Sequence, residues 1–151
     1  MNEETVATLN DLIQLDIDAV HAYSQAIDAC KVAEVRDNLT AFKGDHQRHI
    51  SELEGAVRAL GGQPPTGKDI KGFVIEGFTA IASQGDRSAL LAMRGNEEIT
   101  TRRYDAARRT NVAGDVLELI EKNYADEARH LDWIKQAIDR KVWEKSQGRA
   151  A

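Results

Sequence analysis

Six residues of metal-ligand type occur at positions where a bundle of helices should be apolar. They are carboxylates and imidazoles, and four of them form two pairs in which the partners are three residues apart. A pair at this spacing points two side chains to one side of a helix. Burying an ionised group without a partner costs much free energy, so a bound cation is the expected partner. The six candidate metal ligands are Asp16, His46, His49, Glu97, Glu127 and His130.

The two halves of the chain repeat one pattern of acids, tyrosines and histidines. In each half, an acidic residue precedes a tyrosine by seven residues and a second acidic residue by 29. That second acid opens the sequence DHQRH (45–49) in the first half and DEARH (126–130) in the second. The repeat indicates an internal pseudo-twofold symmetry with ligands in both halves. Its members are Asp16, Tyr23 and Asp45, and Glu97, Tyr104 and Asp126.

The sequence between these motifs favours helix. Aromatic residues make up only 5% of the 151 residues, while residues of high helix propensity, such as Ala, Leu and Glu, dominate. Apolar residues recur at alternating spacings of three and four, the pattern of a helical seam. GGQPPTG (61–67) and Gly85-Asp86 are strong breaks, with Asp86 as a cap for the helix that follows. Softer breaks lie near 31–35 and 111–115, so four helices of about 25 residues are expected.

The lengths of the links predict how these helices are connected. The short links near 31–35 and 111–115 make two antiparallel hairpins. The link over about 61–86 is long enough to run the length of the bundle, and we expect 73–82 to form a short packed helix within it. Two hairpins joined by a long crossover are the ferritin-like arrangement of an all-α four-helix bundle. The chain, 1–151, is then one domain, as its length favours.

Hairpin geometry brings the candidate ligands to one level. Residues equidistant from a hairpin turn lie at the same height along the bundle. Asp16 and His49 average to position 32.5, inside the first turn, and Glu97 and Glu127 average to 112, inside the second. All four helices therefore contribute to one polar layer. Such a layer can hold two metal ions, as in the carboxylate bundles of di-iron proteins.

The composition excludes several classes of protein. Charged residues make up 30% of the chain, the mean hydropathy is −0.48, and no apolar run approaches the roughly 18 residues of a membrane span. The net charge of −5 argues against a nucleic-acid partner, because phosphate binding needs a basic face. The single cysteine, Cys30, allows no internal disulfide. The acidic start MNEETVATLN lacks the features of a signal peptide, so a cytoplasmic protein is expected.

Several motifs resemble those of di-iron carboxylate proteins. DEARH (126–130) matches the D-E-x-R-H signature of proteins such as the small subunit of ribonucleotide reductase, and EARHLDW (127–133) resembles the last bundle helix of bacterioferritin. The spacing of acid and tyrosine is similar to the Glu-x6-Tyr pattern of bacterioferritin and rubrerythrin. Across all four helices the chain resembles the ferritin-like superfamily. Its size, short hairpins and GGQPP crossover are most similar to a bacterial ferritin-like family of unknown function.

The resemblance implies roles for individual residues. Glu97, Glu127 and His130 correspond to one half of a dinuclear metal site. The two acids that open the histidine motifs would accept hydrogen bonds from the ligand rings and fix their orientation. The two tyrosines of the repeat would lie beside the metals. These neighbours are Asp45, Asp126, Tyr23 and Tyr104.

Two positions depart from the pattern of the family. Asp16 stands where the family has the longer Glu, and His46 stands where a Glu-x-x-His pair would have Glu. Three carboxylates and three histidines give the centre a charge of −3 in place of −4, and one candidate bridging carboxylate is lost. Two iron ions are the expected cofactor. Zinc or manganese, or one tightly held and one loose ion, also fit this donor set.

The resemblance implies oxidation of Fe(II) by O₂ or peroxide, as protection during stress, in a homodimer or a higher homo-oligomer. The sequence leaves two alternatives open. One is a non-enzymatic stress or scaffold bundle that holds zinc or no metal. The other is a rubrerythrin-like peroxidase, which needs an electron donor, whereas this chain has no Cys-rich rubredoxin segment.

Overall fold

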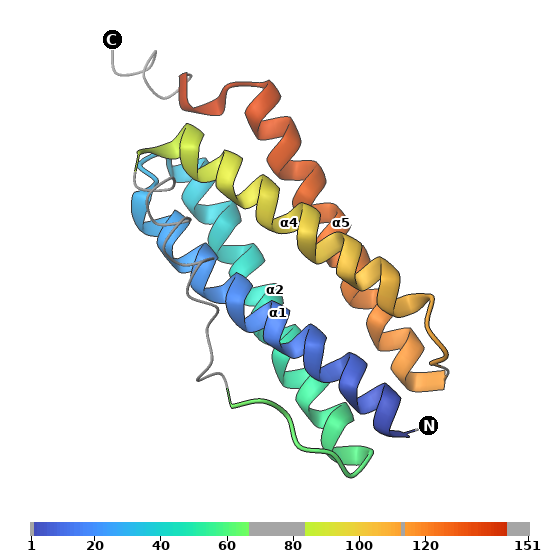
Figure 1. The fold of residues 1–151 in the computed structure, drawn as a ribbon. Coiled ribbons are helices and arrows are strands. Elements are labelled where there is room, and N and C mark those ends of the chain that lie inside the picture. Colours follow the sequence, from blue (N-terminus) through green and yellow to red (C-terminus); the bar gives the residue numbers. More distant parts are fainter. Residues whose placement is uncertain (1, 67–83, 113, 145–151) are drawn as a thin grey trace.

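Four long helices form the described part of the computed structural model, which covers residues 2–66, 84–112 and 114–144 (Figure 1). The helices are α1 (Asn2–Ala29), α2 (Ala33–Ala59), α4 (Asp86–Arg108) and α5 (Gly114–Asp139). These ranges contain no strand. The prediction of an all-α protein is confirmed, while the short helix expected at 73–82 lies outside the described residues.

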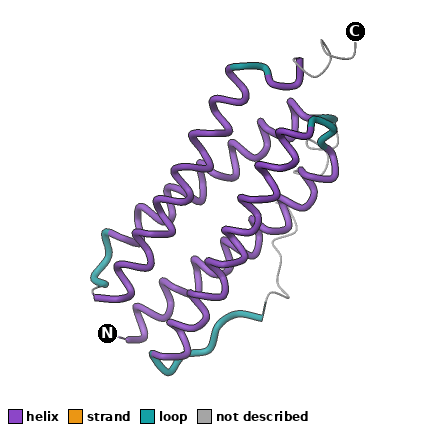
Figure 2. The backbone as a smooth tube through the Cα atoms, turned by 180° about the vertical axis from the view of Figure 1, so that it is seen from behind, coloured by secondary structure: helices purple, strands orange, loops and turns teal. Residues whose placement is uncertain are grey.

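The helices form two antiparallel hairpins that lie side by side (Figures 1 and 2). α1 packs along α2, α4 packs along α5, and α1 also packs against α4. α2 ends at one end of the bundle and α4 begins at the other, so the link between them has to bridge the two ends (Figure 1). Two hairpins joined by one crossover are the ferritin-like topology. The predicted order and connection of the four helices is confirmed.

Asp86 binds the turn that precedes α2 and does not cap its own helix, contrary to the prediction from the sequence. α4 begins at Asp86, and the preceding Gly85 has a φ of 119°, in the region that favours glycine. The Asp86 carboxylate accepts hydrogen bonds from the backbone N–H groups of Lys31 and Val32 at 3.0–3.1 Å. It thereby provides partners for two backbone N–H groups of the turn between α1 and α2. The contact ties the start of α4 to the turn between α1 and α2.

Apolar side chains fill the bundle on both sides of the polar layer. One cluster, toward the turn between α1 and α2, includes Leu39 and Ile134. The other, toward the turn between α4 and α5, includes Leu9 and Ile120. All four are fully buried, and burying a side chain of this size stabilises the fold by roughly 1.5–3 kcal/mol. These clusters provide the free energy that offsets the burial of polar groups between them.

The buried face of α1 differs from the predicted seam. Ala19, Ala22 and Ala26 are buried, whereas Val20 and Ile27, which continue the spacing of three and four residues that begins at Asp16, are half-buried. The physical reason is that α1 packs against both α2 and α4. Its buried face therefore spans two contacts, and small alanines let both neighbours approach closely.

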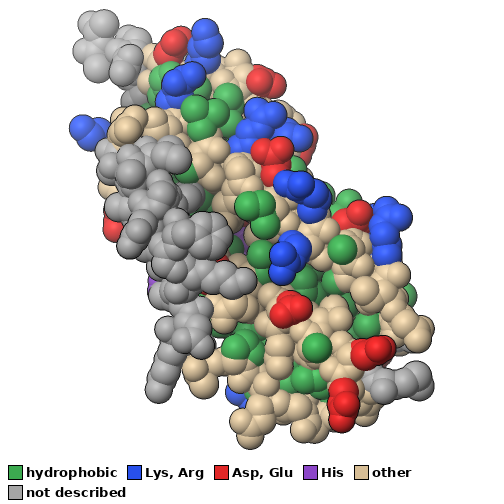
Figure 3. Space-filling model, viewed as in Figure 1, with side chains coloured by type: hydrophobic (Ala, Val, Ile, Leu, Met, Phe, Trp, Pro, Cys, Tyr) green, Lys and Arg blue, Asp and Glu red, His purple; other side chains and the backbone are tan. Residues whose placement is uncertain are grey.

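The surface is charged, and three of the four histidines are fully buried. Figure 3 shows charged side chains spread over one face of the bundle, with almost no histidine surface. Two large apolar side chains on α4, Leu91 and Ile99, are exposed. None of the described helices is both long enough and apolar enough to cross a membrane.

Candidate metal centre

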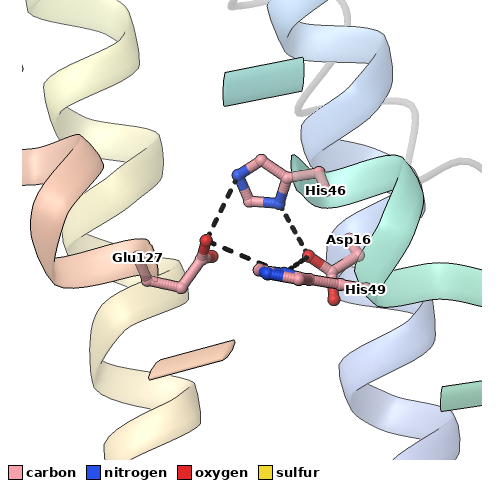
Figure 4. A group of neighbouring side chains, drawn as sticks. All are labelled: Asp16, His46, His49 and Glu127. Carbon is pink, nitrogen blue, oxygen red and sulfur yellow. Dashed lines mark hydrogen bonds and ion pairs between the residues drawn. The ribbon is translucent and has the colours of Figure 1, made fainter. Parts of the chain in front are cut away.

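The six candidate ligands meet in one buried layer inside the bundle. Each has an exposed fraction of 0%, and they form two overlapping groups whose donor atoms lie within 4.8 Å of one another. The first group is Asp16, His46, His49 and Glu127 (Figure 4), and the second is His46, Glu97, Glu127 and His130. The structure thus brings all six predicted residues together, and their role as ligands is a proposal.

The ring of His46 lies between carboxylates from three other helices. Its Nδ1 is 2.6 Å from Oδ1 of Asp16 on α1. Its Nε2 is 2.9 Å from Oε1 of Glu97 on α4 and 3.4 Å from Oε2 of Glu127 on α5. The two ring nitrogens therefore face different carboxylates, and Figure 4 shows one directed to Asp16 and the other to Glu127.

The other two histidines each have one nitrogen inside the layer and one at its edge. Nε2 of His49 lies 2.9 Å from Asp126, and Nε2 of His130 lies 2.8 Å from Asp45. Nδ1 of His49 is 3.3 Å from Oδ1 of Asp16. A carboxylate on the outer nitrogen of a ligating histidine fixes the tautomer and the orientation of the ring. Both inner nitrogens are therefore held toward the layer.

Two arginines join the outer acids across the contact between α2 and α5. Arg48 binds Asp126 and also lies 3.2 Å from Asp45. Arg129 binds Asp45 at 2.8 Å and Asp126 at 3.2 Å. Burial raises the pKa of Asp45, but hydrogen bonds from His130 and Arg129 outweigh it and lower the pKa to about 2. The outer acids are thus ionised acceptors, and the partly exposed arginines are their salt-bridge partners.

Each tyrosine of the repeat holds one carboxylate of the layer. The hydroxyl of Tyr23 donates to Oε1 of Glu97 at 2.5 Å, and that of Tyr104 donates to Oδ2 of Asp16 at 2.5 Å. Burial and the neighbouring carboxylates raise the pKa of both phenols well above the ordinary value. The phenols therefore stay protonated and act as hydrogen-bond donors. Each comes from the hairpin opposite to that of the carboxylate it holds.

Without metal ions, protonated histidines balance the charge of the carboxylates. Burial lowers the pKa of His46, but Glu127 and Glu97 outweigh it and raise that pKa well above its usual value. The pKa of His130 is raised to about 9 in the same way, against burial, by Glu127 and Glu97. Burial raises the pKa of Glu97, but His46 and His130 lower it to about 2. Imidazolium and carboxylate groups thus neutralise one another in the layer.

Some atoms of the layer keep no hydrogen-bond partner among the described residues. Both oxygens of Glu127 and Nδ1 of His130 are buried and make no hydrogen bond. Oε2 of Glu127 and Nδ1 of His130 lie 3.5 Å apart. Burial raises the pKa of Glu127, and Glu97 adds to this while His46 opposes it. Native proteins rarely leave buried polar atoms without a partner. Carboxylate oxygens and imidazole nitrogens suit iron, zinc or manganese, so the residues present fit metal ions.

The surroundings of the layer contain two residues whose roles sequence reasoning missed. Asp16 and Glu97 are 81 residues apart, and this offset also relates Phe42 to Asn123. The Phe42 ring stacks on His130 with a centroid distance of 4.3 Å. Nδ2 of Asn123 lies 3.4 Å from the hydroxyl of Tyr104, and its Oδ1 has no partner in the described part of the chain. Applying the offset of 81 to every seam position would have revealed this pair.

Comparison with known proteins places the chain in a family. The sequence matches a family described as "Domain of unknown function (DUF2383)" over residues 4–110, which include α1, α2 and α4. Comparison with curated proteins finds no match. The structure is similar to a dodecameric thioferritin, the bacterioferritin-related protein from Bacteroides fragilis, with a TM-score of 0.78 and 14% identity. The match covers 97% of this chain and 91% of that chain. The fold is therefore ferritin-like, and the chain belongs to the DUF2383 family.

Proposed function

We propose that this protein holds two divalent metal ions in the polar layer, with iron as the expected metal, and oxidises Fe(II) with O₂ or peroxide. The observation that carries the proposal is the set of buried atoms without hydrogen-bond partners, which comprises both oxygens of Glu127 and Nδ1 of His130. They lie among six buried side chains of ligand type. A buried ionised group of this kind is stabilised by a cation, since water is excluded from it.

The protein groups would divide the two ions between the halves of the layer. Glu97 and His130 face one position, and Asp16 and His49 face the other. Two ferrous ions supply the two electrons that reduce O₂ to peroxide or peroxide to two waters, with two protons from solvent. Carboxylates bind Fe(III) more tightly than Fe(II), and so favour the oxidised product. Hydrogen bonds between the tyrosines and the carboxylates, and between the outer acids and the histidines, hold the donors in place, which is the role of such outer contacts in metal sites.

The setting of this activity is also part of the proposal. We infer a single domain in the bacterial cytoplasm that protects against iron and peroxide during stress. A homo-oligomer is proposed because the similar thioferritin is described as dodecameric. The exposed Leu91 and Ile99 on α4 provide apolar surface for such an interface.

Anaerobic titration with Fe(II) tests the metal content directly. We expect about two irons per chain by elemental analysis, and Fe(III) absorption after exposure to air. The variant Glu127→Ala, His130→Ala should keep its helix content by circular dichroism and lose stoichiometric iron. Glu98→Ala is the matched control, because this acid adjoins Glu97 but has a side chain that is 45% exposed and pairs with Arg94.

Three results would contradict the proposal. Purified protein without stoichiometric iron, zinc or manganese, before and after titration, would favour the non-enzymatic scaffold. Unchanged iron content in the double variant would place the metal elsewhere. Two bound irons that are not oxidised by O₂ or peroxide would leave the metal site standing and remove the oxidation.

A further inference from the structure

His46 differs from the other two histidines of the layer in how its nitrogens are used. His49 and His130 each direct one nitrogen to an outer acid at the edge of the layer. The contacts of both His46 nitrogens are with carboxylates inside the layer. The outer nitrogen of a ligating histidine usually donates to a group that is not itself a ligand. His46 departs from that rule, because its Nδ1 faces Asp16 while its Nε2 faces Glu97 and Glu127, and the residue belongs to both donor groups.

The repeat gives His46 a counterpart that is also shared. The offset of 81 that relates Asp16 to Glu97 relates His46 to Glu127. Of the six side chains, these two are the members common to both donor groups. A carboxylate shares two ions through its two oxygens, and an imidazole can do so through its two nitrogens. We propose that His46 is a bridging ligand, with Nδ1 on the ion held by Asp16 and Nε2 on the ion held by Glu97.

This inference rests on the proposed dinuclear site, and the position of Nδ1 supports it. Nε2 of His49 is 2.9 Å from Asp126, and its Nδ1 is 3.3 Å from Oδ1 of Asp16. Nδ1 of His46 is 2.6 Å from the same oxygen. Three donor atoms from three side chains therefore converge at one point. A cation at this point satisfies all three, with His46 as the link to the second ion.

Neighbouring rings fix the plane of His46. Its ring centroid lies 5.2 Å from that of Tyr23, 5.3 Å from that of His130 and 5.6 Å from that of His49. Its side chain has no exposed surface. In a close-packed interior, a ring in this position has little freedom to turn one nitrogen away from its donor group. The orientation seen in Figure 4 is therefore the one in which metal would be bound.

Bridging also balances the charge of the centre. When the second nitrogen binds an ion, the ring loses its N–H proton to solvent and becomes an imidazolate. Three carboxylates and one imidazolate carry four negative charges, which match two divalent cations. Imidazole nitrogen suits copper and zinc as well as iron. Two metal–nitrogen bonds of about 2 Å on either side of the ring separate the ions by about 6 Å, whereas ordinary two-metal sites have about 3.5–4 Å.

Loading the protein with Cu(II) alone tests the bridge without relying on activity. We expect two copper ions per chain by elemental analysis and a separation of about 6 Å by X-ray absorption spectroscopy. Coupling through the imidazolate should reduce the low-temperature electron paramagnetic resonance signal well below that of two isolated ions. His46→Gln should remove the coupling, and His46→Glu should shorten the separation to about 4 Å. His21→Gln is the control, because His21 is the one histidine of the chain outside the layer.

The outcomes separate this inference from the proposed function. Two ions at about 3.5–4 Å, or two ions without coupling, would overturn the bridge and leave the dinuclear site intact. Fewer than two copper ions per chain would overturn the bridge, and the anaerobic iron titration would still decide the dinuclear site. If the His46 variants fail to fold, the metal–metal distance and the coupling in the unaltered protein still decide the question.

Discussion

The two halves of the metal centre share a supporting frame but differ in their donors. In both halves a tyrosine holds the carboxylate of the first helix, and an acid paired with an arginine holds the outer histidine. The half on α4 and α5 supplies Glu97, Glu127 and His130, whereas the half on α1 and α2 supplies Asp16, His46 and His49. The comparison shows that these repeated supporting contacts can keep the ligand side chains at one height and in one direction while the types of the ligand residues change.

The residues that surround the two halves also differ in polarity. Phe42 covers the ring of His130 with an apolar face, which excludes water from that side. The equivalent position near Tyr104 is Asn123, which has a buried oxygen with no partner among the described residues. The nitrogen-rich half is therefore also the more polar one. We expect the two ions to differ in affinity and in access to solvent molecules.

Glu127→Gln should break both halves at once and give the largest effect. Glu127 belongs to both donor groups, so its loss should weaken metal binding by at least about 100-fold, as loss of a charged ligand with its supporting contacts does. The metal-free protein should become less stable, because Glu127 is a charge partner of His46 and His130 and its loss leaves their buried charges less compensated. Isothermal titration calorimetry and urea unfolding in chelator measure the two effects.

The exposed Glu121 on the same helix is the control for this variant. Glu121→Gln should change neither the metal affinity nor the unfolding free energy. A Glu127→Gln protein that binds metal as tightly as the unaltered protein would show that this carboxylate is only an ion-pair partner of the histidines. The charged layer would then be a feature of the fold alone.

Asp45→Asn and Asp126→Asn should separate the halves. Asp126 on α5 holds His49, and Asp45 on α2 holds His130. Each variant should weaken one ion by about 10- to 100-fold, the usual effect of removing an outer carboxylate from a ligating histidine. Asp126→Asn should weaken the ion beside Asp16, and Asp45→Asn the ion beside Glu97. Stepwise titration with Co(II), followed by absorption, distinguishes the two sites.

Equal weakening of both ions by each variant would contradict this assignment. Asp132→Asn is a suitable control, because Asp132 is exposed on α5 and bonds only to a neighbouring glutamine one turn away in the contacts described. It should leave both titration steps unchanged.

The sequence predicts the fold and the level of the centre because both follow from periodicity. Helix seams and link lengths place Asp16 and Glu97 at one height without any knowledge of side-chain contacts. The contact of Asp86 with the first turn could not be predicted in this way, since its partners at Lys31 and Val32 are brought close only by the packing of α4 beside that turn. Periodicity is local information, whereas this contact depends on tertiary structure.

Finer features of the site depend on orientation within the layer. Spacing places His46 on the inner face of α2, but only the packed structure shows that its two nitrogens face different carboxylates. The same holds for Phe42 and Asn123, which a hydrophobic pattern treats as ordinary seam positions. A spacing of three residues predicts on which face of a helix a side chain lies. The orientation of a ring on that face depends on the side chains that pack around it.

Raising the pH should distinguish the metal-free centre from the loaded one. The pKa of His130 is raised to about 9, where Glu127 and Glu97 outweigh the effect of burial. Its stabilising contribution is full below the unfolded pKa of about 6.5 and is lost as pH rises through about 9. The metal-free protein should therefore lose stability, on the order of 3 kcal/mol, between these values. Urea unfolding in chelator at several pH values measures the loss.

Metal-loaded protein should show the opposite trend over the same range. Ions compete with protons for the imidazoles, so metal affinity rises as the rings deprotonate. Stability that falls equally with and without metal would mean that the histidines do not bind it.

Arg48→Lys and Arg129→Lys should give the smallest effect and show whether the halves are coupled. Both guanidinium groups are partly exposed and each contacts Asp45 and Asp126, so each change should lower the unfolding free energy by about 0.5 kcal/mol. The ammonium group of lysine lacks the planar arrangement of donors with which a guanidinium group binds two carboxylates. Because both arginines share both acids, the double variant should lose less than the sum of the single losses. A double-mutant cycle by urea unfolding measures this difference, with Arg102→Lys on α4 as an exposed control. Additive losses would mean that each arginine stabilises only its own half. The two outer histidines, His49 and His130, would then be connected only through the backbone.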